Sequence, residues 1–108
     1  MPYNESMEFV ESPLFTKLVH DYVTDHEYAI LQQHLVQHPE SGVLIPKSNG
    51  LRKIRMAAKG HGKSGGARII YYFKKNPKEI WLLTIYAKNE IENLPLKLLK
   101  EIAKELEL

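Results

Sequence analysis

The chain has 108 residues, of which 44% are apolar and 26% are charged, a balance typical of one folded domain and not of a disordered segment. It contains no cysteine, which excludes disulfides, thiolate metal sites and cysteine nucleophiles. No apolar run approaches the roughly 20 residues of a membrane-spanning helix, and the first residues do not resemble a secretory signal. We therefore expect a single cytoplasmic domain over 1–108 with no membrane partner.

The net charge of +2 hides a strong asymmetry along the chain. Residues 1–40 carry seven acidic side chains and one lysine, and residues 79–108 carry six acidic and four basic side chains. Residues 41–78 hold ten lysines and arginines and no acidic residue. A concentrated cationic segment attracts polyanions and indicates nucleic-acid binding, although a solvated lysine-rich face has the same composition.

The N-terminal part predicts a strand over 7–12 and two helices, one over 13–22 and one up to residue 38. The first helix has a serine cap followed by proline, and the second has a threonine three residues before a glutamate, the spacing of a capping box. Apolar residues recur at helical spacing in the second helix until a proline ends the pattern. These signals are Ser12, Pro13, Thr24, Glu27 and Pro39.

A loop rich in proline and glycine follows, with room for a short extended piece, and then three strands and a helix. The last strand is apolar on both faces, which places it inside the sheet. The predicted order is β-α-α-β-β-β-α. We expect an α+β fold with a small, mainly antiparallel sheet, two N-terminal helices on one face and the C-terminal helix near an edge. The expected ranges are 39–50 for the loop, 51–57, 67–73 and 79–87 for the strands, and 94–108 for the helix.

The segment KGHGKSGGAR, residues 59–68, has the composition of a phosphate-binding loop. Gly60, Gly62 and Gly65 fit a dinucleotide-binding pattern, but that turn must lead into a helix and a strand follows here. The other common phosphate loop fails too, because Ala57 stands where its first glycine belongs. We interpret the segment as a cationic hairpin loop whose glycines allow close approach to phosphate. Basic residues would converge at this end of the sheet: Lys53, Arg55, Lys59, Lys63 and Arg68.

Two stretches, GLRKIRMAAKGHGKSGGARIIYYF at 50–73 and LLTIYAKNE at 82–90, resemble the HigB-like branch of the RelE superfamily of toxins from bacterial type II toxin–antitoxin systems. The resemblance covers nearly the whole chain and includes the order of elements. It implies a ribosome-dependent messenger RNA endonuclease that cuts the codon in the A site of the 70S ribosome. It also implies a cognate antitoxin, a HigA-like helix-turn-helix protein, and no metal or other cofactor.

The resemblance further implies the chemistry and its residues. The ribose 2′-hydroxyl attacks the adjacent phosphate and the 5′-oxygen leaves, which requires a base, an acid and stabilisation of the phosphorane charge. Arg68 is expected to stabilise that charge, and Arg55 or Lys59 to handle the phosphate and the proton. Tyr86 is expected to position the nucleotide. The residues expected to bind RNA or the ribosome are Arg52, Lys53, His61, Lys63 and Lys88.

Two positions depart from the family's pattern. Ala57 stands where some relatives have a second basic residue, and Asn89 where others have an arginine, so the division of acid and base roles stays open. A second interpretation is therefore a non-enzymatic RNA- or ribosome-binding regulator on the same scaffold. DNA binding is a weaker third, because no predicted helix carries a basic recognition face. His34 and His38 have the spacing of two zinc ligands, but no third ligand lies near them in the sequence.

Overall fold

The computed structural model describes residues 7–57, 66–88 and 95–105. Its elements follow the predicted order, with one addition, a two-residue strand in the loop after the second helix. This strand corresponds to the short extended piece that the sequence allowed within the loop. In chain order the elements are β1 (Glu8–Glu11), α1 (Pro13–Tyr22), α2 (Asp25–Gln37), β2 (Val43–Leu44), β3 (Leu51–Met56), β4 (Ala67–Lys75), β5 (Lys78–Ala87) and α3 (Leu96–Glu105).

The five strands form one sheet in the order β1-β5-β4-β3-β2. β1 runs parallel to β5, and all other neighbours are antiparallel, so the sheet is mainly antiparallel as predicted. β5 lies inside the sheet, between β1 and β4, which confirms the inference from its apolar sequence. At the other side, β2 is the outermost strand and covers only part of β3.

Both N-terminal helices begin at the predicted caps. The Ser12 hydroxyl accepts a hydrogen bond from the backbone N–H of Phe15 at 3.0 Å and donates one to the carbonyl of Leu83 at 2.7 Å, so this cap also fixes α1 to β5. Thr24 and Glu27 form the complete capping box of α2. Local hydrogen bonding therefore determines where both helices start.

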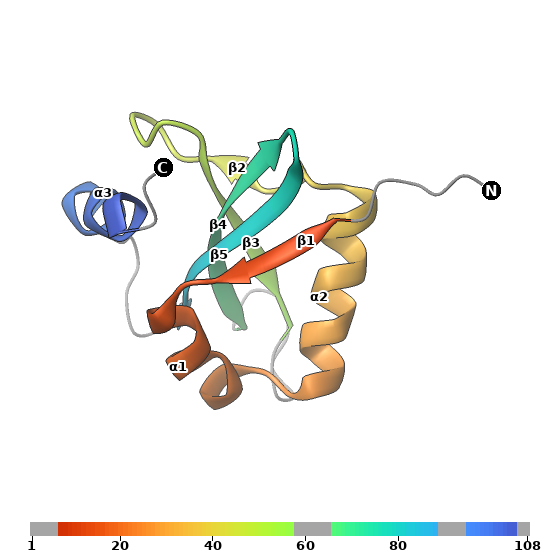
Figure 1. The fold of residues 1–108 in the computed structure, drawn as a ribbon. Helices are drawn as coiled ribbons and strands as arrows, with labels where there is room; N and C mark the ends of the chain where they lie inside the picture. The colour runs from red at the N-terminus through yellow and green to blue at the C-terminus, as the bar shows by residue number, and fades with distance from the viewer. Residues whose placement is uncertain (1–6, 58–65, 89–94, 106–108) are drawn as a thin grey trace.

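The sheet is covered on both faces. On one face, α1 and α2 pack the apolar side chains of Phe15, Val19, Leu31 and Leu35 against the inner residues of β4 and β5. On the other face, Leu99 and Ile102 of α3 pack against the sheet, and Figure 1 shows α3 and α2 on opposite sides of the strands. The residues of the sheet in this second cluster are Leu51, Ile70, Leu83 and Tyr86.

The position of α3 corrects one expectation, since the helix was placed near an edge of the sheet. Leu83 and Ile70 are both at most 1% exposed, on the face away from α1 and α2. Interior strands that are apolar on both faces need a layer on each side, and α3 supplies the second layer. Within the described ranges, no helix is both long and apolar enough to span a bilayer.

The loop between α2 and β2 is held against the sheet by Tyr71. The Tyr71 hydroxyl donates to the carbonyl of Pro39 and accepts from the backbone N–H of Gly42, both at 2.9 Å. A Cβ at Gly42 would lie 2.7 Å from the ring of Tyr71, so glycine permits this close approach. Arg52 completes the connection by donating to the carbonyls of Glu40 and Gly42 at 2.9 and 2.8 Å.

Candidate nucleic-acid site

Three of the four predicted catalytic residues form one row across the sheet. Arg55 of β3 is paired with Arg68 of β4, and Arg68 is paired with Tyr86 of β5. Residues directly opposite each other on neighbouring strands project to the same face. Tyr86 packs with α3, whereas Ile54 and Met56, the neighbours of Arg55, pack with the cluster on the opposite face. The row therefore lies on the face that α3 covers.

Exposure falls steeply along this row. Arg55 is exposed to solvent, Arg68 is 7% exposed and Tyr86 is 4% exposed. The Arg68 guanidinium donates a long hydrogen bond of 3.4 Å to the carbonyl of Gly66. Two arginines directly opposite on adjacent strands repel each other, and an anion that contacts both would relieve this repulsion. The row thus combines an accessible cation with a largely buried one.

The surroundings of Tyr86 define its protonation state. Burial raises the pKa of the Tyr86 phenol above its ordinary value of 10.0, and the positive charge of Arg68 opposes part of that increase. The phenol is therefore protonated at neutral pH and is a proton donor there, not a base. Because Leu99 and Ile102 of α3 pack in the same cluster, the Tyr86 ring is covered in this structure and does not offer a surface for a base.

A groove of about 660 Å³ lies beside the row, between α2 and the part of β3 that β2 leaves uncovered. Its described lining contains no acidic residue and no phenylalanine, tyrosine or tryptophan. The lining combines aliphatic residues with basic ones and with a histidine and a serine that contact each other at 2.9 Å. The members are Ile30, Leu31, His34, Ser41, Val43, Lys53, Ile54, Arg55, Met56, Arg68 and Lys88.

The other predicted RNA-binding residues divide into three groups. Lys53 and Lys88 line the groove together with Arg55 and Arg68. Arg52 does not, because its guanidinium bonds the loop carbonyls described above and lies 3.8 Å from the Glu40 carboxylate. Its position is that of a structural residue on the α2 side of the sheet. Lys59, His61, Lys63 and Asn89 lie outside the described residues.

The groove also contains residues that the sequence did not single out as site residues. Ile30 and Val43 are 50% and 71% exposed, which is unusual for aliphatic side chains that border a cationic surface. His34, considered as a zinc ligand with His38, instead contacts Ser41, and the two histidine rings are 5.3 Å apart. Across residues 7–57, 66–88 and 95–105, no three potential metal-ligating side chains gather in one place.

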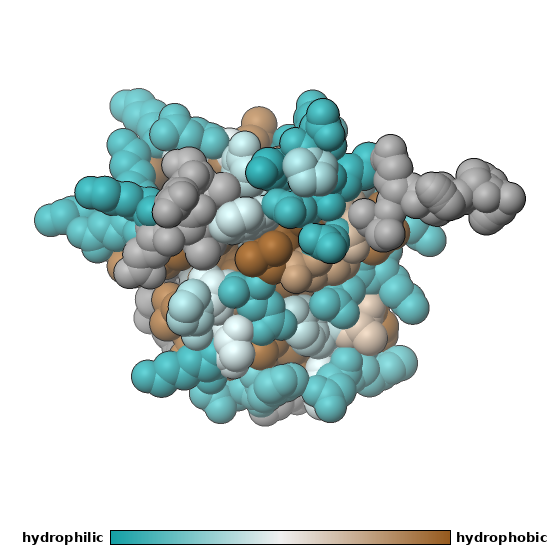
Figure 2. Space-filling model, viewed as in Figure 1, coloured by the Kyte–Doolittle hydropathy of each residue, from teal (hydrophilic) through white to brown (hydrophobic). Residues whose placement is uncertain are grey.

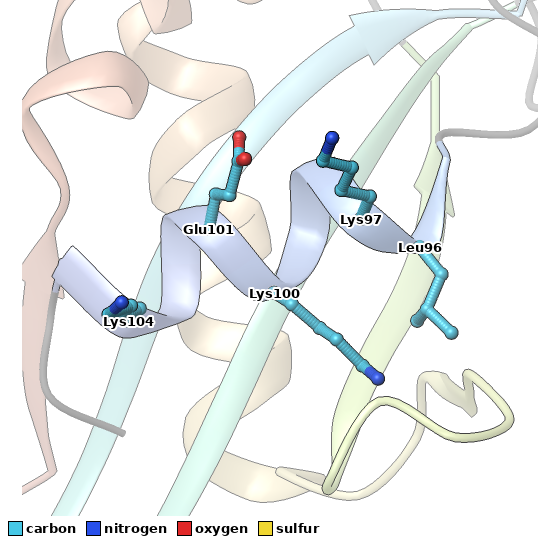
Figure 3. Close-up of a pocket in the computed structure, with 5 residues that line it drawn as sticks. All are labelled: Leu96, Lys97, Lys100, Glu101 and Lys104. Atoms are coloured by element: carbon cyan, nitrogen blue, oxygen red, sulfur yellow. The ribbon is translucent and has the colours of Figure 1, made fainter.

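A second pocket of about 400 Å³ lies on α3, and its described lining residues all belong to that helix. Figure 3 shows Lys97 and Glu101 on one side of the helix and Lys100 pointing to the other. Hydrophilic side chains cover α3 in the space-filling view (Figure 2). This alternation of lysine and glutamate is typical of the solvated face of an amphipathic helix, and we assign no binding function to it.

Comparison with known proteins identifies the fold. No model of a known protein family matches the chain. Among solved structures, the chain is similar to an arginine-to-alanine double mutant of the E. coli toxin RelE in the free state, with a TM-score of 0.60 and 12% sequence identity over 94% of this chain and 97% of that chain. At that identity the similarity establishes the fold alone. The predicted RelE-like fold is thus confirmed, whereas the HigB-like branch stays a prediction.

Proposed function

We propose, from the RelE-like fold and the cationic row across its sheet, that this chain is the toxin of a type II toxin–antitoxin system. It would cut messenger RNA in the A site of the 70S ribosome and thereby inhibit translation in the cytoplasm, and a cognate HigA-like antitoxin would silence it. The HigB-like resemblance of 50–73 and 82–90 supports this proposal. The observation that carries it is the direct pairing of Arg55 with Arg68 beside the protonated Tyr86.

The two arginines suit different parts of the reaction. Arg55 is exposed and would contact the phosphate as RNA arrives. Arg68 is 7% exposed, and a charge in such a poorly solvated place interacts more strongly with the negative charge that develops on the phosphorane. In the reaction, the 2′-oxygen forms a bond to phosphorus and the bond from phosphorus to the 5′-oxygen breaks. Arg68 would stabilise the charge between these two events.

The reaction also moves two protons, one from the 2′-hydroxyl to a base and one from an acid to the leaving 5′-oxygen. Arginine stays protonated in proteins, so of Arg55 and Lys59 the lysine is the better base. The phenol of Tyr86 is protonated and therefore has the state of an acid. We propose the acid role for Tyr86 in place of base stacking, since α3 covers its ring.

One observation favours the second candidate, a regulator that binds RNA or the ribosome without cleaving it. Tyr86 is 4% exposed beneath α3, so the proposed acid is largely shielded from RNA. The exposed cations Arg55 and Lys88 would bind RNA phosphates whether or not Tyr86 reaches the RNA. Binding and cleavage are therefore separate properties of this scaffold and must be tested separately.

The test is induction of the chain in bacteria that lack any antitoxin, with mapping of new messenger RNA 5′ ends. The nuclease predicts growth arrest and in-frame cuts inside translated codons, and both should disappear in the double variant Arg68→Ala, Tyr86→Phe. Lys17→Ala, on the exposed side of α1, is the control and should cut like the wild type. Arrest without new ends, or no arrest from soluble protein, would favour the binding-only regulator.

A further inference from the structure

We propose that the groove between α2 and β3 docks an extended segment of a partner protein, in which aliphatic and acidic side chains alternate. Three independent features of the groove lead to this partner: an uncovered strand edge, an aliphatic lining and several basic side chains. The docking itself requires no nuclease activity. Its consequence, that the segment keeps RNA away from Arg55 and Arg68, rests on the proposed function.

The first feature is the outer edge of β3. β2 pairs with this edge only at Arg52 and Lys53, where their partners are Leu44 and Val43. Beyond that point, from Ile54 to Met56, no strand of the described chain pairs with the outer edge of β3. An uncovered strand edge presents backbone N–H and C=O groups that an extended peptide can pair with. The groove lies along this stretch, since Ile54, Arg55 and Met56 all line it.

The second feature distinguishes a peptide from RNA. Single-stranded RNA is held by cations that contact its phosphates and by side chains, mostly aromatic, on which its bases stack. The described lining of the groove has no phenylalanine, tyrosine or tryptophan, and the imidazole of His34 contacts Ser41. The apolar members are aliphatic, with Ile30 half exposed and Val43 71% exposed. Aliphatic surfaces of this kind bind aliphatic side chains of a protein segment, since alternate residues of an added strand point into the same groove.

The third feature sets the charge of the segment. Lys53, Arg55 and Lys88 line the groove together with Arg68, and no acidic residue belongs to its described lining. Glutamate or aspartate in the segment would pair with these cations, whereas a basic segment would be repelled. The alternation follows from the geometry of a strand, because side chains that face the aliphatic lining and side chains that face the cations lie on opposite sides of the same peptide.

The probe is a fluorescent synthetic peptide in which valine and glutamate alternate. It has about eight residues, which is the length of an ordinary strand. Its binding to the purified chain is measured by fluorescence anisotropy. A peptide of the same composition with all glutamates in one block, and a peptide that alternates valine and lysine, should bind at least about tenfold more weakly. Equal binding of either control would overturn the proposal, as would the absence of any binding by the alternating peptide.

The chain offers a matched pair of variants. Ile30 and Val36 both lie on α2 and are 50% and 49% exposed, but only Ile30 lines the groove. Ile30→Glu should weaken the binding of the alternating peptide by about tenfold or more, because the new carboxylate repels the glutamates of the peptide. Val36→Glu should leave the binding of this peptide unchanged. Thermal unfolding checks that both variants are folded. Equal effects of the two substitutions would show that the peptide binds elsewhere.

Two readouts separate this proposal from its alternatives. The Leu51 carbonyl bonds the N–H of Ile45 at the outer edge. By alternation the Arg55 N–H also points to that edge, whereas those of Ile54 and Met56 point to β4. Hydrogen exchange of the Arg55 amide should slow when the peptide is added, and unchanged exchange would rule out strand addition.

A short single-stranded RNA should bind Ile30→Ala as well as it binds the wild type, because this variant adds no charge and removes only aliphatic surface, whereas the alternating peptide should bind it more weakly. Loss of RNA binding in place of peptide binding would make the groove an RNA site. The peptide assay contains no ribosome, so its result stands whether or not the chain cleaves messenger RNA.

Discussion

Arg55 and Arg68 stand directly opposite each other on β3 and β4, and Tyr86 occupies the next position of the same row on β5. Like charges in this position destabilise a sheet by roughly 0.2–1 kcal/mol. The polyanion that we propose as ligand would relieve the repulsion between the two arginines when it binds. The arrangement therefore predicts a conflict between stability and binding at this site.

Arg55→Glu should separate the two effects. The substitution creates opposite charges across the strands, so the free energy of unfolding is expected to stay unchanged or to rise by up to about 1 kcal/mol. RNA binding and cleavage should fall sharply, because a carboxylate then repels the phosphate. Urea unfolding and filter binding measure the two quantities. Lys17→Glu has the same change in net charge on α1 and should leave RNA binding nearly as it was. A clear loss of stability in Arg55→Glu would contradict the argument.

The salt dependence of RNA binding should report which cations touch phosphate. Each contact to a single strand contributes about 0.7 to the slope of the logarithm of affinity against the logarithm of salt concentration. Arg55→Ala and Lys88→Ala are each expected to reduce that slope by about this amount, since both residues line the groove and are exposed. Arg52→Ala should leave the slope unchanged, because its guanidinium bonds Glu40 and Gly42. A reduced slope in Arg52→Ala would restore this residue to the RNA-binding set.

The N-terminal half of the fold could be predicted closely because its signals are local. Ser12 and Pro13 set the start of α1, and Thr24 and Glu27 set the start of α2, within a few residues of the backbone groups that they satisfy. The place of α3 could not be predicted in the same way. An apolar stripe along a helix shows that one face of the helix is buried. It does not show against which part of the sheet that face packs.

The site was predictable in part for a similar reason. Arg55, Arg68 and Tyr86 project to one face because alternation along strands fixes the direction of their side chains, and the resemblance indicated all three. The burial of Tyr86 depends on where α3 packs and so was missed. The groove joins α2 to β3, which are separate in the chain, and the exposed Ile30 carries no local signal beyond lying off the buried stripe of Leu31 and Leu35.

The two helix caps should differ in their contribution to stability. Ser12 is 2% exposed and binds both Phe15 of its own helix and the carbonyl of Leu83 in the sheet. Ser12→Ala removes both bonds and leaves a buried carbonyl without this donor, so we expect a loss of about 2–3 kcal/mol. Thr24→Ala removes a cap at the exposed start of α2 and should cost about 1 kcal/mol. Urea unfolding of the two variants shows which substitution lowers the free energy of unfolding more. Equal losses would show that the hydrogen bond from Ser12 to Leu83 adds nothing to stability.

Alkaline pH should destabilise the fold through its buried tyrosines. The pKa values of Tyr28, Tyr71 and Tyr86 are all raised, in each case chiefly by burial, so the folded state holds these protons more tightly than the unfolded state does. The resulting stability is complete below about pH 10, the ordinary pKa of tyrosine, and is lost as the pH rises above it.

A variant of one of these tyrosines should reduce that loss. At Tyr28 the hydrogen bond to Glu11 and the negative charge of that carboxylate add to the effect of burial. Tyr28→Phe should therefore lower stability at neutral pH and also make it less dependent on pH above about 10. Urea midpoints measured from about pH 7 to pH 11 give both quantities. Thr24→Ala, which lowers stability at the start of the same helix without removing a tyrosine, is the control and should keep the wild-type pH dependence. If Tyr28→Phe loses stability above pH 10 as steeply as the wild type, the contact to Glu11 does not hold the phenol proton in the folded state.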